Sequence, residues 1–364
     1  MKLMTGAPRP TTVPRSGGAV ADPRSSSVGF VDVASMSRWI AEQGAERIIG
    51  AMAEALERDF ARWPQFDKSP RHAVHSHDGV MELMPTSDGV EYGFKYVNGH
   101  PNNPLTGHQT VTAFGVLAEV AHGYPTFVSE MTLLTALRTA ATSAMAARHL
   151  ARPDATTMAM IGTGSQSEFQ ALGFRAVLGI ASLRVYDTDP AATAKLVRNL
   201  EPLGFDIVVA SSAAEAVAGA DVITTCTADK RNATVLHDVD VVAGVHINAI
   251  GGDCPGKTEL DAATLDRASV FVEYPEQTRV EGEIQQMPGD FAVTELWRVV
   301  AGELAGRRSA EEITVFDSVG FAIEDFTALR FVRDAVRGTS YEAKLDLIAE
   351  PDDPKDLFGM VAPA

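Results

Sequence analysis

The segment at residues 158–187 constrains the fold of this chain more than any other stretch. An apolar run leads into Gly162 and Gly164, a helical pattern follows, and a second apolar run ends at Asp187. A strand, a glycine-rich turn, a helix and a second strand that ends in a carboxylate form the first βαβ unit of a dinucleotide-binding domain. Gly162 permits the tight turn, and Gly164 lets a pyrophosphate approach the backbone at the helix N-terminus. Because Ser167 stands where the pattern has its third glycine, an α/β domain whose glycines only make the turn is the alternative.

Strands and helices alternate through the rest of this half of the chain. Helical periodicity is clearest at 167–178 and 190–200, and it returns around 281–286 and from 324 to about 336. This alternation is typical of a mostly parallel sheet that helices cover on both faces. Strands are expected at 158–161, 183–186, 207–209, 222–225, 245–249, 270–272 and 313–316.

The N-terminal half has a different pattern. Apolar residues at helical spacing predict one long helix from about residue 37 to residue 63, after a short strand at 31–36. Alternation of apolar and polar residues then favours a largely antiparallel sheet, followed by an alanine-rich helix at 131–150. The strands of this sheet are expected at 80–84, 92–97, 110–117 and 126–129.

Composition excludes several classes of function. The chain of 364 residues has a net charge of −17 without a basic stripe, which argues against a nucleic-acid partner. No apolar run reaches the length that spans a bilayer. Only Cys226 and Cys254 occur, so we expect no disulfide framework and a cytoplasmic protein. Residues 1–27 are rich in Pro, Gly, Ser and Arg and are expected to form a disordered tail, with a transit peptide as the alternative.

Six short segments spread over the chain carry a resemblance to known proteins. They are Asp-Lys-Ser-Pro-Arg at 67–71, Glu-Leu-Met-Pro at 82–85, Phe-Lys-Tyr-Val-Asn-Gly-His at 94–100, Ala-Leu-Arg-Thr-Ala-Ala-Thr-Ser at 136–143, Gly-Gly-Asp-Cys-Pro-Gly-Lys-Thr-Glu-Leu at 251–260 and Asp-Ser-Val-Gly-Phe-Ala-Ile-Glu-Asp at 317–325. From residue 31 to residue 358 the chain resembles the ornithine cyclodeaminase/mu-crystallin family. Within that family it looks most similar to the bacterial ornithine cyclodeaminases.

The resemblance implies an α/β enzyme of two domains that forms a homodimer. A Rossmann-type NAD-binding domain would span residues 153–317, and an α+β substrate-binding and dimerisation domain with an antiparallel sheet would span 28–152 and 318–364. The implied reaction converts L-ornithine to L-proline and ammonia through internal hydride transfer by NAD. Two alternatives are an NAD(P)H-dependent ketimine reductase or amino-acid dehydrogenase on the same scaffold, and a binding protein without turnover.

Three cations are candidate ligands for the carboxylate of an amino-acid substrate. That carboxylate must be held rigidly so that the α-carbon faces the nicotinamide, and Arg holds a carboxylate in a bidentate fork. The resemblance implies this role for Arg71, Lys95 and Arg138, and it adds Val319 as a further substrate contact. Periodicity alone would make the three cations surface residues, because most Lys and Arg side chains lie there.

Asp253 and Glu82 are the candidate catalytic carboxylates. Asp253 follows two glycines after the strand at 245–249, at the edge where ligands bind in open α/β sheets. A carboxylate there can take a proton from an ammonium group and give one to departing ammonia, which is the role that the resemblance implies. Glu82 would contact the cationic substrate. The alternatives are a turn or capping residue for Asp253 and a solvent-facing strand residue for Glu82.

Asp187 predicts NAD rather than NADP as the cofactor, because a carboxylate at this place repels a 2′-phosphate. We expect no metal, since His72, His75 and His77 lack the companions of a metal motif. The resemblance adds further cofactor ligands to Gly162, Gly164 and Asp187. They are Thr110, Arg138, Ser165, Gln166, Thr227, Lys257 and Ser318.

Overall fold

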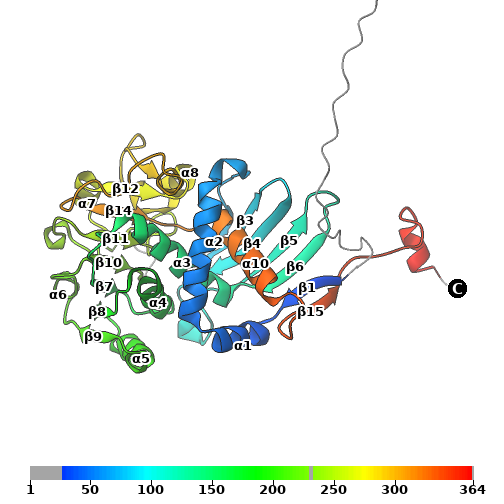
Figure 1. The fold of residues 1–364 in the computed structure, drawn as a ribbon, viewed down its shortest axis with the longest axis horizontal. Coiled ribbons are helices and arrows are strands. Elements are labelled where there is room, and N and C mark those ends of the chain that lie inside the picture. The colour runs from blue at the N-terminus through cyan, green and yellow to red at the C-terminus, as the bar shows by residue number, and fades with distance from the viewer. Residues whose placement is uncertain (1–26, 229–232, 363–364) are drawn as a thin grey trace, which may run out of the picture.

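Two sheets, with helices between and around them, make up the chain (Figure 1). The computed structural model describes residues 27–228 and 233–362. A seven-stranded sheet has the order β15-β1-β6-β5-β4-β3-β2 and is antiparallel except for the pair β1–β6. Its strands are β1 (Ser27–Val31), β2 (His72–His75), β3 (Val80–Ser87), β4 (Glu91–Gly99), β5 (Ala113–Glu119), β6 (Pro125–Glu130) and β15 (Ala343–Asp346).

The second sheet has eight strands, and each neighbouring pair is parallel. Its order is β13-β12-β14-β11-β10-β7-β8-β9, so the strand order reverses between β7 and β10. Ligands bind at such a switch point, beyond the carboxyl ends of the strands. The strands are β7 (Thr157–Ile161), β8 (Ser182–Tyr186), β9 (Asp206–Val209), β10 (Val222–Thr225), β11 (His246–Ala249), β12 (Ser269–Val272), β13 (Thr294–Glu295) and β14 (Thr314–Asp317).

Helices join the two sheets through one continuous core. Buried residues of α2, α3 and α10 pack with residues of both sheets in a single apolar cluster, and these helices lie between the sheets in Figure 1. The α/β fold class predicted from the sequence is therefore confirmed. The helices are α1 (Val33–Gln43), α2 (Ala45–Ala61), α3 (Thr132–Leu150), α4 (Ser167–Leu178), α5 (Pro190–Leu200), α6 (Ala213–Val217), α7 (Ala262–Arg267), α8 (Pro275–Glu281), α9 (Leu296–Val300) and α10 (Ala322–Val336), with the 3-10 turns η1 (Trp63–Gln65), η2 (Asn103–Thr106), η3 (Glu201–Leu203), η4 (Asp238–Asp240), η5 (Glu283–Gln286) and η6 (Leu357–Met360).

Two expectations for the N-terminal part are wrong in detail, and one strand near the C-terminus was not predicted. The first strand lies at Ser27–Val31 rather than at 31–36, and most of the predicted tail lies outside the described residues. The predicted long helix is instead two helices, because Gly44 adopts φ 84° and its N–H donates to the carbonyl oxygen of Ile40, which ends the first helix. A positive φ ends an α-helix, and glycine adopts it at the least cost. The segment after residue 341 adds the strand β15, which pairs with β1.

The two positions Gly93 and Gly115 let α10 lie close to the seven-stranded sheet. A Cβ at Gly93 would stand 2.9 Å from the Phe326 ring and 3.0 Å from Leu117, and one at Gly115 would overlap Met131. Both glycines lie on the buried face of their strands. The first turn of α10 is thereby pressed against β4, which decides where its polar side chains lie.

Gly93→Val should lower the melting temperature, because the added methyl groups push α10 from the sheet. Overpacking of this kind typically costs about 1–3 kcal/mol. Gly99→Ala on the same strand is the control, since its Cβ would meet only Val80, at 3.4 Å. Thermal unfolding followed by circular dichroism measures both variants. Equal melting temperatures for Gly93→Val and the parent protein would contradict the close packing of α10.

Candidate active site

The glycine-rich turn after β7 has the geometry of a phosphate cradle. Gly162 adopts φ 97°, and a Cβ there would stand 2.7 Å from the carbonyl oxygen of Cys226 in the loop after β10. No atom lies within 4 Å of a Cβ placed at Gly164, so the backbone is open on that side. Helix α4 begins at Ser167, three residues later. These observations fit a pyrophosphate bound at the helix N-terminus.

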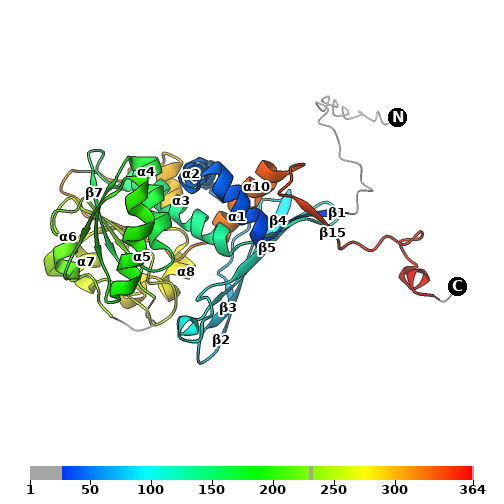
Figure 2. The same cartoon turned by 90° about the horizontal axis from the view of Figure 1, so that it is seen from below.

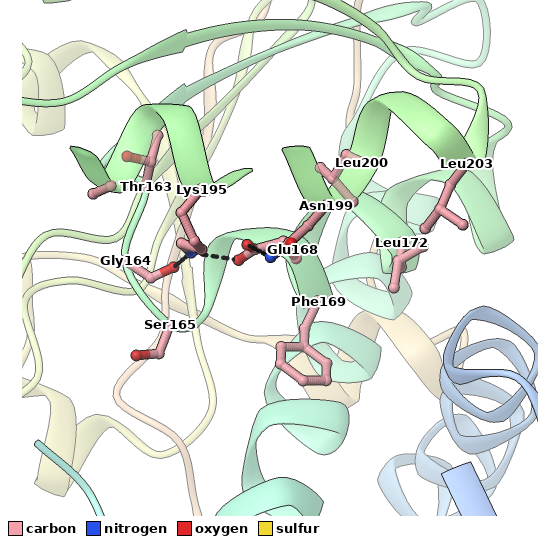
Figure 3. A pocket seen from close by; sticks show the side chains of 11 residues that line it. Thr163, Gly164, Ser165, Glu168, Phe169, Leu172, Lys195, Asn199, Leu200 and Leu203 are labelled. Carbon is pink, nitrogen blue, oxygen red and sulfur yellow. Dashed lines mark hydrogen bonds and ion pairs between the residues drawn. The ribbon is translucent and has the colours of Figure 1, made fainter. Parts of the chain in front are cut away.

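A pocket of about 540 Å³ opens beside this turn, between α4 and α5 (Figure 3). Lys195, which the sequence did not single out, donates to the carbonyl oxygen of Gly164 at 2.9 Å and pairs with Glu168 at 2.8 Å. Asn199 donates to the other oxygen of Glu168. The cation of Lys195 is thus already compensated by a carboxylate. The pocket is lined by Thr163, Gly164, Ser165, Glu168, Phe169, Leu172, Ala192, Lys195, Asn199, Leu200 and Leu203.

Asp187 lies at the end of β8, directly beside the turn. Its Oδ2 accepts hydrogen bonds from the backbone N–H of Thr163 at 2.6 Å and from the Thr163 hydroxyl at 3.0 Å. Its Oδ1 accepts from the N–H of Asp189. Each carboxylate oxygen has two lone pairs, so Oδ2 uses both and Oδ1 keeps one that a ribose hydroxyl could still use. The carboxylate therefore braces the glycine turn, and its contact with a ribose stays a prediction.

Asp187→Ser should narrow the preference for NAD⁺ over NADP⁺, because it removes the charge that repels a 2′-phosphate. The variant should also weaken NAD⁺ binding, since Thr163 loses its brace. Calorimetric titration with both nucleotides measures the two affinities. Asp206→Ser is the control, an equal charge change at the exposed start of β9, and it should leave the preference as it is. A parent protein that binds NAD⁺ and NADP⁺ equally well would overturn the prediction.

Arg71 lies at the centre of a group of buried acceptors. Its Nη1 stands 3.1 Å from Glu82, and its Nε stands 3.1 Å from Glu281. Nη2 donates to the carbonyl oxygens of Val319 and Gly320 at 2.6 and 2.8 Å. The predicted residues Arg71, Glu82 and Val319 thus meet, although they come from the loop before β2, from β3 and from the segment after β14.

Lys95 and Arg138 form a second buried group beside the first turn of α10. The ammonium of Lys95 on β4 lies 2.8 Å from Asp325, and Nε of Arg138 on α3 lies 3.0 Å from the same oxygen. Nη1 of Arg138 donates to Glu324 at 2.6 Å. A Cβ at Gly320 would stand 2.7 Å from Arg138, so this glycine, at φ 73°, leaves the room that the guanidinium occupies. Neither cation is a surface residue.

Asp253 and Lys257 lie together beyond the carboxyl ends of β10 and β11. Their charged groups are 3.6 Å apart, and Lys257 also donates to the carbonyl oxygen of Thr227 at 2.8 Å. Burial lowers the pKa of Lys257, but Asp253 and Glu259 outweigh it and raise that pKa above its usual value. The side chain of Asp253 is 56% exposed, so it can exchange protons with solvent.

Buried carboxylates accept hydrogen bonds from the backbone that continues from the Asp253 loop. Glu283 accepts the N–H groups of Glu259 and Leu260, and Asp317 accepts those of Glu283 and Ile284. Cβ atoms at Gly251 and Gly252 would meet the carboxylates of Glu259 and Glu283. The two glycines before Asp253 are therefore needed for this close packing.

The sequence missed Glu281, the last residue of α8. Burial raises its pKa to about 7, Arg71 opposes that shift, and Glu82 and Asp253 add to it. A carboxyl group that titrates near neutral pH, beside a cation and two other carboxylates, is typical of a functional site. Only its position next to Arg71 identifies Glu281 as a site residue. In the sequence it belongs to a charged helix, a pattern that is typical of a solvent-exposed surface.

Four further predicted cofactor ligands have other partners in the described chain, whereas Ser165 lines the pocket beside the glycine turn. Gln166 donates to the carbonyl oxygen of Ala136 on α3, and the Ser318 hydroxyl donates to Glu273. Thr227 donates its N–H to Glu259. Thr110, in the loop between β4 and β5, accepts from the N–H of His100. Their contacts with a dinucleotide stay predictions, as do the domain boundaries proposed from the sequence.

Within residues 27–228 and 233–362, no three His, Cys, Asp or Glu side chains are grouped to hold a metal ion. The described helices include none that is both long and apolar enough to cross a membrane. The absence of a metal cofactor stays a prediction.

The structure has the features of a dinucleotide-dependent enzyme that acts on small charged molecules. They are the parallel sheet with its open glycine turn at the switch point, and the buried cations and carboxylates beside it. The sequence matches the ornithine cyclodeaminase/mu-crystallin family over residues 34–340. The chain belongs to this family, which confirms the resemblance seen in the sequence.

Individual relatives agree with this assignment. An ornithine cyclodeaminase of Brucella suis biovar 1 is 61% identical over 342 residues, which cover 94% of this chain and 96% of that protein. A lysine cyclodeaminase, solved to explain its recognition of L-lysine, L-ornithine and L-2,4-diaminobutyric acid, superimposes with a TM-score of 0.86 at 32% identity and covers 91% of this chain and 99% of its own. An archaeal alanine dehydrogenase dimer with bound NAD has a TM-score of 0.80 at 31% identity, with 88% and 100% covered.

Proposed function

We propose that this chain is an ornithine cyclodeaminase that converts L-ornithine to L-proline and ammonia with NAD as its cofactor. The observation that carries the proposal is the charge pattern of the buried site. Arg71, Lys95 and Arg138 would bind the single carboxylate of the substrate, and the nearby Glu82, Glu281 and Asp253 could pair with its two amino groups. The Brucella suis relative is an ornithine cyclodeaminase, and the archaeal alanine dehydrogenase binds NAD.

The three cations would hold the α-carboxylate and so fix the direction of the α-carbon. Lys95 and Arg138 share the carboxylate of Asp325, and Arg71 donates to the carbonyl oxygens of Val319 and Gly320. Orienting a reactant in this way removes much of the entropic cost of reaction. The glycine turn, Asp187, Thr227 and Lys257 would hold NAD. When bound, NAD would supply the hydride acceptor and donor that the reaction needs.

Asp253 would move the protons of the reaction. The δ-ammonium of ornithine must lose a proton before its nitrogen attacks the α-carbon, and the α-amino nitrogen must gain one before it leaves as ammonia. The ammonium of Lys257 lies 3.6 Å from Asp253, whose exposed side chain could pass a proton to solvent between turnovers. Glu82 and Glu281, on either side of Arg71, would face the cationic end of the substrate.

One assay tests the function directly. L-Ornithine with a catalytic amount of NAD⁺ should yield equal amounts of proline and ammonia, without a lasting rise of NADH absorbance. A ketimine reductase or amino-acid dehydrogenase would instead consume or produce the nicotinamide in proportion to its substrate. Stoichiometric build-up of NADH would therefore select this alternative and contradict the proposal.

Asp253→Asn should reduce proline formation by about 10²–10⁴-fold, because positioned acid/base catalysis typically contributes that much. The amide keeps the shape of the side chain but cannot accept a proton, so binding of NAD⁺ should stay as in the parent. Asp261→Asn is the matched control. That residue caps α7 through the N–H of Ala263, and Asn caps a helix as well as Asp does. Proline formation by Asp253→Asn within a few-fold of the parent would make Asp253 a turn residue only.

We also propose a homodimer formed through the outer face of the seven-stranded sheet. Helices α1, α2 and α10 lie along the other face, and no described helix covers this one (Figure 2). Leu83, Tyr96 and Phe114 stand in one row across β3, β4 and β5, with Leu83 44% and Phe114 46% exposed. A contiguous apolar face of this kind is typical of an interface. With only two cysteines in the chain, we propose a cytoplasmic location.

A further inference from the structure

One carboxylate oxygen lies between two of the three cations. Oδ1 of Asp325 is 2.8 Å from Nζ of Lys95 and 3.0 Å from Nε of Arg138. The three residues come from different elements, namely α10, β4 and α3. Their side chains are at most 8% exposed, so water screens these interactions little.

The usual role of an acid in the first turn of a helix does not explain Asp325. Such a residue stabilises the helix dipole by about 0.3–1 kcal/mol when it is exposed. The side chain of Asp325 is only 1% exposed, and burying a carboxylate costs several kcal/mol unless ions or hydrogen bonds compensate for it. Oδ2 has no hydrogen bond to any described residue. The contacts with Lys95 and Arg138 are therefore what holds this carboxylate in the core.

Both cations keep donors for a ligand. The ammonium of Lys95 has three N–H groups, and within the described residues it makes a hydrogen bond only to Asp325. For Arg138, Nε faces Asp325 and Nη1 donates to Glu324, whereas the described chain offers no hydrogen-bond partner to Nη2. Asp325 and Glu324 thus hold the cations from the α10 side and leave donors unused.

We propose that Asp325 is a positioning residue, which sets the distance between Lys95 and Arg138 and so shapes the site for the substrate carboxylate. The inference rests on the proposed function of that site. In this role Asp325 itself would touch neither substrate nor cofactor. Its effect is transmitted by the two cations whose charged groups it holds within 3.0 Å of one oxygen.

The same carboxylate keeps Lys95 charged. The pKa of Lys95 is lowered to about 8, because burial, Arg138 and Arg71 together lower it more than Asp325 raises it. Glu324 also faces this group, and burial raises its own pKa. Without Asp325 the pKa of Lys95 falls below 8, so the ammonium loses its proton at a lower pH. Binding of a carboxylate should then weaken at a lower pH than in the parent protein.

Two variants distinguish the role of Asp325 in spacing the two cations from its role in keeping Lys95 charged. Asp325→Asn keeps the shape and removes the charge, and Asp325→Glu keeps the charge and lengthens the side chain. The probe is pentanoate, a five-carbon carboxylate without amino groups, titrated calorimetrically into the NAD⁺-loaded enzyme from pH 6 to pH 9. Asp334→Asn, at the exposed end of α10, is the control for a charge change on the same helix.

For Asp325→Asn we expect affinity for pentanoate about tenfold or more lower, because Lys95 and Arg138 lose the oxygen that fixes their spacing, and a misplaced contact can cost up to about 10²-fold. The loss of binding should also move to lower pH, because Lys95 loses its proton more readily without this carboxylate. For Asp325→Glu we expect weaker binding with the pH dependence of the parent. Affinity for NAD⁺ should stay within twofold in both.

Pentanoate binding that is unchanged in Asp325→Glu would overturn the role in spacing. A pH dependence in Asp325→Asn that equals that of the parent would overturn the role of Asp325 in keeping Lys95 charged. If Asp325→Asn does not fold, Asp325→Glu alone tests the role in spacing. Because pentanoate binding needs no turnover, these results are independent of the reaction. A parent protein that binds pentanoate but makes no proline would refute the proposed function and leave this inference intact.

Discussion

The pairing of buried cations with buried carboxylates is the interaction on which the rest of the site depends. Arg71, Lys95 and Arg138 are each within 3.1 Å of at least one acid, and none is on the surface. Unpaired charges in such a place would cost many kcal/mol, so the acids are a condition for having the cations at all. An amino acid that enters adds a carboxylate and ammonium groups to an array in which each cation already has an acidic partner.

Chain topology brings these partners together. Strand β14 is late in the sequence but lies between β11 and β12, so the segments after the three strands meet at one edge of the sheet. The chain then continues directly into α10, whose first turn lies against β4 because Gly93 and Gly115 leave no side chain in the way. The short passage from Val319 to Asp325 therefore supplies the carbonyl oxygens at Arg71 and the carboxylates at Lys95 and Arg138.

Local patterns were enough to predict the parallel sheet, the glycine turn and most strands within a few residues. Apolar periodicity and the glycine that a positive φ favours can both be recognised from neighbouring residues. Gly44 was missed because a single glycine within a helical pattern is usually tolerated. Strand β15 was missed because Ala-Lys-Leu-Asp has weak strand propensity and depends on β1, more than 300 residues earlier. Glu281 and Asp325 were not identified because their partners are distant in sequence, and no local pattern records such pairs. For the same reason the bracing role of Asp187 could not be foreseen.

The central claim is that hydride leaves the α-carbon of ornithine and returns to the same carbon of the ring product. The most direct measurement uses L-ornithine that carries deuterium at the α-carbon, with NAD⁺ at about one hundredth of its concentration, and determines the deuterium in the proline by mass spectrometry. This account predicts proline that keeps nearly all of the deuterium at its α-carbon while NADH does not accumulate. Proline without deuterium, or NADH formed in proportion to the ornithine consumed, would contradict it.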